Sequence, residues 1–184
     1  MRADLEEVAP ATQTHTHNSV LRERIVEHVF VGEMLRRLWQ LGNTEVEVLR
    51  SEFDRGGYDL VVAFGTVVRH IQFKSSLLSS STTEQSISVR LAEKPSGCVI
   101  WVVVTPDLLI SHFLWFGGAP GEPLSGIHDM KVAKQARANA QGFKADRPDH
   151  RKLPKSKFQR LDNFDLVLSR LFGSAVISGT SPNP

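Results

Sequence analysis

The chain has 184 residues, of which 41% are hydrophobic and 23% charged, and its formal net charge is +2. A chain of this length can bury roughly 70% of the surface that its unfolded form exposes, so we expect a self-sufficient globular fold. The single cysteine, Cys98, excludes an internal disulfide. The longest apolar run, residues 98–104, is far shorter than the roughly 20 residues of a membrane span. Because residues 1–10 lack the apolar segment of a secretory signal, we expect a cytoplasmic protein.

The first half of the chain predicts one helix followed by three strands. Residues 1–18 are polar and aperiodic and are expected to form a flexible leader. From Val20 to Leu41 the pattern is helical, because Leu21, Ile25 and Val29 recur at a helical spacing that Leu35 or Trp39 continues. Alternating apolar residues then predict three strands, the last two joined as a hairpin: residues 44–51, 58–64 and 67–74.

The second half predicts three more strands, at residues 87–91, 99–104 and 112–116. The middle one is apolar on both faces and is therefore expected at the centre of the sheet. A short basic helix is expected at residues 130–139 and an amphipathic terminal helix at residues 158–172. Residues 174–184 are expected to form a disordered tail, which leaves residues 19–173 as a single domain.

Basic residues are concentrated between positions 131 and 160, where ten lysines and arginines face two aspartates, a local charge of +8 beside −6 for the rest. Such a segment suits a polyanion, because contacts to phosphates release condensed counterions. A solvated connector accounts equally well for the same composition. The candidate nucleic-acid-binding residues are basic side chains of this segment: Lys131, Lys134, Arg137, Lys144, Arg151 and Lys152.

Polar side chains are expected to gather at one end of the predicted sheet. In the third strand, His70, Gln72 and Lys74 share the face opposite to the core, since side chains alternate along a strand. If the second strand pairs with it, Asp59 places a carboxylate beside this amide and ammonium. The helix can add Glu33, which sits on an apolar flank where a carboxylate is costly without a partner.

The order of these residues resembles the PD-(D/E)xK nuclease superfamily, which has the restriction-endonuclease-like fold. The resemblance rests on Glu33, on Gly57-Tyr58-Asp59-Leu60-Val61-Val62 and on His70-Ile71-Gln72-Phe73-Lys74-Ser75, within roughly residues 20–104. Tyr58 stands where the superfamily has its namesake proline. Gln72 replaces the second acidic residue, as in Mrr-like and Holliday-resolvase-like variants with a Gln-x-Lys motif. The resemblance implies an α/β fold, with a mixed β-sheet flanked by helices in the core order α-β-β-β-α-β.

The resemblance also implies an activity, a cofactor and a set of catalytic residues. The expected protein is an endonuclease of restriction, repair or defence that hydrolyses DNA with Mg²⁺ or Mn²⁺. Asp59, Gln72, the backbone carbonyl of Phe73 and Glu33 would hold the metal. Lys74 would activate the attacking water and stabilise the charge that develops on the phosphate.

Three alternatives remain open. Glu27 is the alternative helix carboxylate, because periodicity alone does not choose between it and Glu33. The protein is instead a catalytically silent nucleic-acid-binding module if the uncharged amide of Gln72 binds metal too weakly. A purely structural or oligomerisation domain is the third alternative. The protein could be a monomer or a homodimer, and the sequence does not choose between these two states.

Overall fold

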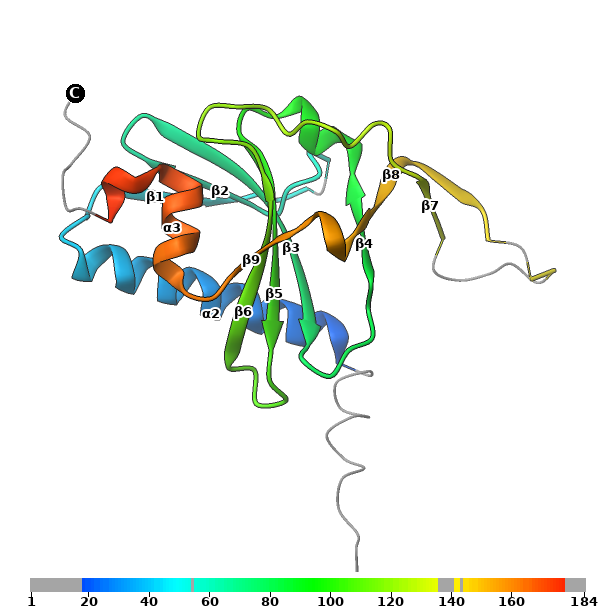
Figure 1. Cartoon of the computed structure of the whole chain (residues 1–184), viewed down its shortest axis with the longest axis horizontal. Helices are drawn as coiled ribbons and strands as arrows, with labels where there is room; N and C mark the ends of the chain where they lie inside the picture. The colour runs from blue at the N-terminus through cyan, green and yellow to red at the C-terminus, as the bar shows by residue number, and fades with distance from the viewer. Residues whose placement is uncertain (1–17, 54, 136–140, 143, 178–184) are drawn as a thin grey trace, which may run out of the picture.

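The computed structural model describes residues 18–53, 55–135, 141–142 and 144–177, and shows a mixed α/β architecture (Figure 1). Its elements are α2 (Ser19–Gln40), β1 (Val46–Arg50), β2 (Leu60–Phe64), β3 (Val67–Leu77), β4 (Glu84–Ser88), η1 (Val89–Glu93), β5 (Gly97–Val104), β6 (Ile110–Gly117), β7 (Val132–Lys134), β8 (Asp146–Pro154), η2 (Lys155–Lys157), β9 (Gln159–Leu161), α3 (Phe164–Phe172) and η3 (Ser174–Val176). None of the described helices is long and apolar enough to cross a membrane. Residues 1–17 of the expected leader lie outside the described residues.

The main sheet has six strands in the order β1-β2-β3-β5-β6-β9. It is mixed, because β3 and β5 run parallel whereas its other neighbouring strands run antiparallel. The expected fold class, a mixed sheet with helices against it, is confirmed. Every residue of β5 is buried, which confirms that this apolar strand is central. The expected hairpin is also confirmed, since β2 and β3 pair up to Phe64 and Val67 on either side of their turn.

Helices α2 and α3 cover one face of the main sheet (Figure 1) and enclose the larger apolar cluster. The buried apolar residues of α2 are Val26, Phe30, Met34 and Leu38, four positions apart throughout. The prediction chose the wrong stripe of this helix: Leu21 is 60% exposed and Trp39 is 73% exposed. Two apolar stripes run along α2, and only contact with the sheet decides which of them is buried.

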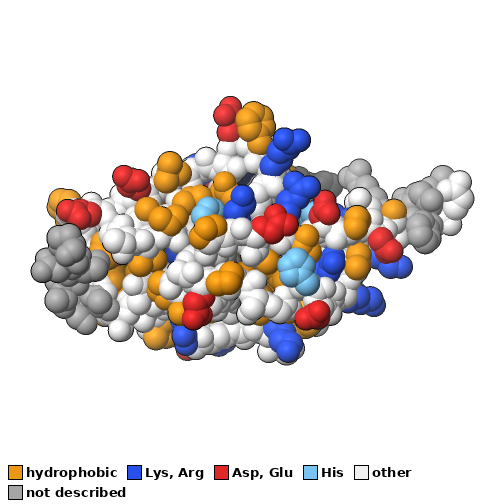
Figure 2. Space-filling view, turned by 90° about the horizontal axis from the view of Figure 1, so that it is seen from above, with side chains coloured by type: hydrophobic (Ala, Val, Ile, Leu, Met, Phe, Trp, Pro, Cys, Tyr) orange, Lys and Arg blue, Asp and Glu red, His pale blue; other side chains and the backbone are white. Residues whose placement is uncertain are grey.

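A second, smaller sheet of order β4-β8-β7 covers the opposite face of the main sheet. It closes a second apolar cluster that includes Ile87, Trp101 and Leu153. The basic helix predicted over residues 130–139 is wrong at Val132–Lys134, which form β7; residues 136–140 lie outside the described part. Strand β8 was not predicted. It pairs with β7 and provides hydrogen-bond partners for the backbone N–H and C=O groups of β7. Figure 2 shows the molecule from above, and most of the Lys and Arg side chains visible there lie in the half that carries this small sheet.

Three other predicted boundaries are corrected. The strand expected at residues 87–91 is β4 and ends at Ser88, whose side chain caps η1 by accepting from the Arg90 amide. Helix α3 begins only at Phe164, because the Asn163 side chain accepts from the Leu166 amide and fixes the first turn there. The expected tail is ordered at its start, where Val176 is buried and its carbonyl accepts from Asn43 Nδ2 at 2.9 Å.

Candidate active site

A cavity of about 320 Å³, which we call the polar cavity, opens between the first half of α2 and the second half of β3. It contains both carboxylates and cations, together with neutral oxygen donors. Its lining residues are Val20, Glu23, Arg24, Val26, Glu27, Asp59, Phe73, Lys74, Ser75 and Gln85. Asp59 and Lys74, predicted as site residues, therefore share one cavity with Phe73.

Asp59 stands at the point where β2 and β3 separate. The Asp59 amide donates to the Ile71 carbonyl at 2.9 Å, and its Oδ2 accepts from the Phe73 amide at 2.7 Å. The Asp59 carboxylate thus accepts the hydrogen bond of the Phe73 amide, which a carbonyl would accept if β2 continued alongside β3. Beyond Phe73, β3 continues to Leu77 with β5 as its partner. The polar cavity lies beside this open edge, where Asp59 is held in a fixed position.

Because the polar cavity lies at an edge of β3, side chains from both faces of the strand reach it. Lys74 and Ser75 are neighbours in sequence, yet both line the cavity. The Ser75 hydroxyl is buried and has no hydrogen-bond partner among the described residues. From the small sheet, β4 adds the amide of Gln85. A ligand in the cavity would therefore meet one ammonium and two neutral polar groups from adjacent strands.

Helix α2 brings Glu23 and Glu27, but not Glu33, to the polar cavity, and the buried one of these two carboxylates is Glu27. It is only 5% exposed, and it forms ion pairs with Arg24 on its own helix and Arg50 on β1. Arg50 also contacts His28 Nδ1 at 3.3 Å. Two guanidinium groups thus compensate a carboxylate that would otherwise be costly to bury.

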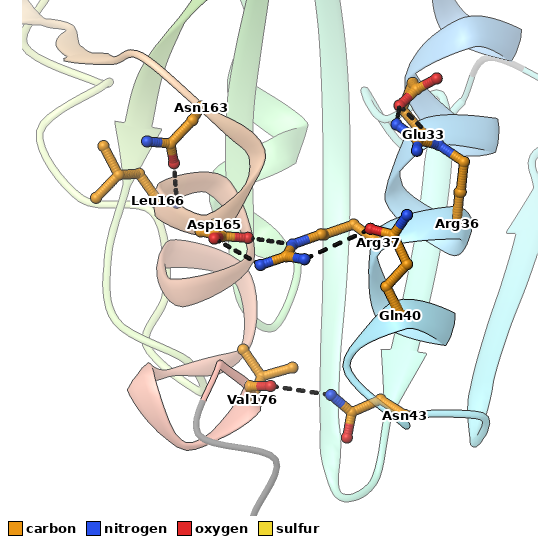
Figure 3. Close-up of polar contacts among 9 residues, drawn as sticks. All are labelled: Glu33, Arg36, Arg37, Gln40, Asn43, Asn163, Asp165, Leu166 and Val176. Carbon is orange, nitrogen blue, oxygen red and sulfur yellow. Dashed lines mark hydrogen bonds and ion pairs between the residues drawn. The ribbon is translucent and has the colours of Figure 1, made fainter.

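Glu33 lies elsewhere on α2, paired with Arg36 on an exposed face (Figure 3). It lines a different, mainly apolar cavity beside Leu109 and Phe164. Six residues along a helix turn the side chain by roughly 120° from the starting direction, so Glu27 and Glu33 cannot serve one site. Of the two carboxylates considered from sequence, the structure brings only Glu27 to Asp59 and Lys74.

Gln72 does not line the polar cavity. It is buried under β4, and its Oε1 accepts from the Ser88 amide at 3.3 Å. His70 shares its face, contacts the Pro95 carbonyl at 2.7 Å through Nδ1 and packs against Tyr58. This face was expected to point away from the core, but the small sheet covers it. The amide of Gln72 consequently holds the end of β4 in place.

The polar cavity is lined by oxygen groups of the kind that a hard cation takes as ligands. The described residues contain no group of three or more His, Cys, Asp and Glu side chains arranged to hold a metal. Mg²⁺, however, retains several waters and takes one or two carboxylates from the protein. Asp59 and Glu27 are two of the carboxylates that line the cavity, and the Ser75 hydroxyl supplies a buried oxygen that no described group uses.

Three features of this site were not found from the sequence. Gln85 lies between the strands expected at residues 67–74 and 87–91, although it belongs to β4. Ser75 was considered only as part of the motif, and Arg50 only as part of the strand expected at residues 44–51. Contacts between distant segments define all three roles, so the local pattern held no signal for them.

The basic segment lies on and around β7 and β8. Lys131, Lys134 and Lys144 are exposed. Arg151 donates to the carbonyls of His128 and Pro148, and Lys152 pairs with Glu84. Arg137 lies outside the described residues.

Comparisons with known proteins add one structural neighbour. The sequence matches no family model and no curated protein. The chain is similar to a bacterial homing endonuclease, I-Ssp6803I. The two are 23% identical, the alignment covers 67% of this chain and 84% of that chain, and the TM-score is 0.32.

Proposed function

We propose that this protein is a metal-dependent endonuclease that hydrolyses phosphodiester bonds of DNA in the polar cavity. The observation that carries the proposal is the meeting of Asp59, Lys74 and Glu27 on one cavity, contributed by the residue before β2, by β3 and by α2. Asp59 is fixed by the Phe73 amide, and Glu27 is fixed by two arginines. Fixed carboxylates beside an ammonium suit the hydrolysis of a phosphate diester, because carboxylates can hold a metal ion and an ammonium can stabilise developing negative charge.

Each side chain has a distinct role in this proposal. A divalent ion, when bound, neutralises phosphate charge and lowers the pKa of an attacking water. Asp59 would hold the ion, with Ser75, Gln85 and the Phe73 carbonyl as neutral oxygens. The Lys74 ammonium would orient the water and stabilise the negative charge of the transition state. Glu27 would complete the ligand set from α2.

In this proposal Gln72 acts as a positioning residue. Its Oε1 is hydrogen-bonded to the Ser88 amide, at the end of the strand that carries Gln85. Exchanging it for Glu would keep the acceptor and add a charge close to the cavity. We therefore assign to Gln72 the support of β4. The direct contacts with the metal and the attacking water are assigned to Asp59 and Lys74.

The test compares two carboxylates of the same helix. We expect Glu27→Gln, Asp59→Asn and Lys74→Ala each to lower the rate of plasmid cleavage with Mg²⁺ or Mn²⁺ by about 100-fold or more. Glu33→Gln should cleave as the wild type does, because Glu33 lies outside the polar cavity. Cleavage is followed on gels over time, at saturating metal.

Thermal melting of each variant provides the control, since a lost activity counts only where the fold persists. An inactive wild type on linear, supercoiled and branched DNA with both metals would contradict the proposal. Loss of activity in Glu33→Gln with retention in Glu27→Gln would show that Glu33 is the carboxylate that α2 contributes to the reaction.

A catalytically silent nucleic-acid-binding module is the second candidate, and two observations favour it. Gln72 gives its Oε1 to the Ser88 amide, and Arg24 and Arg50 already neutralise Glu27. A ligand that binds only the folded state must raise the melting temperature. The nuclease predicts a rise with Mg²⁺ or Mn²⁺ that disappears in Asp59→Asn, whereas the silent module predicts no rise in either protein.

A further inference from the structure

Beyond Ser88, where β4 ends, β7 and the part of β8 before His150 continue as a two-stranded ribbon that projects beyond the main sheet at one end of the molecule (Figure 1). We call the described residues of 131–154 the basic arm. It carries six basic and two acidic side chains, a net charge of +4. Lys131, Lys134 and Lys144 are exposed and form no ion pair within the described structure. The arm therefore presents cations that no described acidic side chain compensates, which suits a polyanionic partner.

The shape of the basic arm selects the kind of polyanion. The major groove of B-form DNA is about 12 Å wide and admits a two-stranded β-ribbon. The major groove of A-form RNA is too deep and narrow for side chains to read. Proteins that bind single strands use exposed aromatic rings as stacking platforms. Phe143, the one such residue among positions 131–154, lies outside the described residues, so it is the ribbon shape of the arm that favours duplex DNA.

The small sheet connects the basic arm to the polar cavity. Gln85 lines the cavity and pairs with Leu153 of β8 in the register between β4 and β8. Two residues before Leu153 on β8, Arg151 lies opposite Val132 of β7, and two further steps along β7 lead to Lys134, past a bulge in β8. At about 3.3 Å per residue, these four steps span roughly 13 Å. Since base pairs are stacked about 3.4 Å apart, the span corresponds to roughly 4 base pairs.

We propose that the basic arm enters the major groove of duplex DNA, roughly 4 base pairs to one side of the bond held at the polar cavity. Lys131 and Lys134 contact phosphates along the groove, and the polar side chains of the ribbon face the base edges. The location relative to the cleaved bond rests on the proposed function. Binding by the arm does not, because it requires neither metal nor cleavage.

The experiment measures binding of the full chain to a fluorescent duplex of about 30 base pairs, in EDTA, over a range of salt. We expect Lys131→Gln/Lys134→Gln to weaken binding about 10-fold near 0.1 M salt and to flatten the slope of log K against log salt by up to about 1.8. The matched control removes two exposed cations from α2 and β9, in Arg36→Gln/Arg160→Gln. Its affinity and slope should equal those of the wild type.

Groove choice is tested on the same complex with two competitors. Methyl green, which occupies the major groove, should displace the protein, whereas netropsin, which occupies the minor groove, should not. Displacement by netropsin alone would overturn the inference, as would equal affinities of the arm variant and its control. A duplex RNA or a single DNA strand that binds as tightly as the duplex DNA would also overturn it.

The two proposals fail separately. Arm-dependent binding with an inactive wild type would contradict the proposed hydrolysis and leave the arm's role standing. Cleavage by the wild type, together with DNA binding that does not change in Lys131→Gln/Lys134→Gln, would contradict the role of the arm and leave the proposed hydrolysis standing.

Discussion

Arg69 is a fully buried cation that joins β3 to the end of α3. Its Nε donates to the Leu171 carbonyl at 2.7 Å, and its Nη2 donates to the carbonyls of Arg170 at 2.6 Å and Gly118 at 3.1 Å. The guanidinium also lies 5.5 Å from the ring centroid of Trp115. Burial lowers its pKa from the ordinary value of an arginine, because desolvation disfavours the charged form. The charge satisfies carbonyls at the C-terminus of α3 that have no partner within the helix.

We expect Arg69→Met to lower the free energy of unfolding by about 3 kcal/mol, since methionine fills much of the space and offers no donor. Urea denaturation followed by circular dichroism measures the change. Arg170→Met is the control, because the Arg170 side chain is not the group that caps the helix, and its effect should stay within about 0.5 kcal/mol. Equal stability of Arg69→Met and the wild type would show that the carbonyls find water instead.

Helices α2 and α3 are connected by a bidentate ion pair (Figure 3). Arg37 Nε lies 2.6 Å from Asp165 Oδ1, and Arg37 Nη2 lies 2.8 Å from Asp165 Oδ2. The hydrogen bonds from Arg37 hold the pKa of the Asp165 carboxyl below its usual value. Asp165 also lies in the first turn of α3, where a negative charge is favourable. The pair therefore sets how α3 docks beside α2.

We expect Asp165→Asn to lower the melting temperature by a few degrees near neutral pH. Because the folded-state pKa of Asp165 is lowered, its contribution is complete above the unfolded pKa and is lost as pH falls through the folded pKa. The difference between variant and wild type should thus shrink as pH falls from about 5. Melting curves across pH check this, with Arg37→Gln/Asp165→Asn as the control that should melt like Asp165→Asn alone. A difference that grows in acid would contradict the assignment.

Two apolar clusters lie on opposite faces of β5, so this strand is enclosed by the whole fold. Cys98, near its start, is fully buried, and burial raises the pKa of its thiol to about 12. The thiolate is the reactive form, so the folded protein keeps this cysteine both inaccessible and protonated.

We expect Cys98 to resist an aromatic disulfide reagent in mildly alkaline buffer and to react only after global unfolding. The labelled fraction at increasing urea should follow the loss of circular dichroism, because a central strand opens only when the molecule does. Unfolded protein provides the control for full reactivity. Labelling well below the unfolding transition would show that β5 is exposed by a local opening.

Sequence alone determined the parts that depend on neighbouring residues. The hairpin of β2 and β3 follows from alternation and a short turn, and it brings Asp59 and Lys74 together at a fixed register. The apolar run of residues 98–104 identified the central strand, because no other environment accepts it on both faces. A helix over the first segment was equally evident from its period.

Only the tertiary structure decided which face of that helix meets the sheet. Its two apolar stripes both satisfy a helical period, and burial of Phe30 and Met34 turned Glu27 toward the polar cavity and Glu33 away. The small sheet likewise depends on pairing between β4 and β8, more than fifty residues apart. Contacts of that kind leave no local periodicity, because their energy comes from surfaces that meet only after the chain has folded.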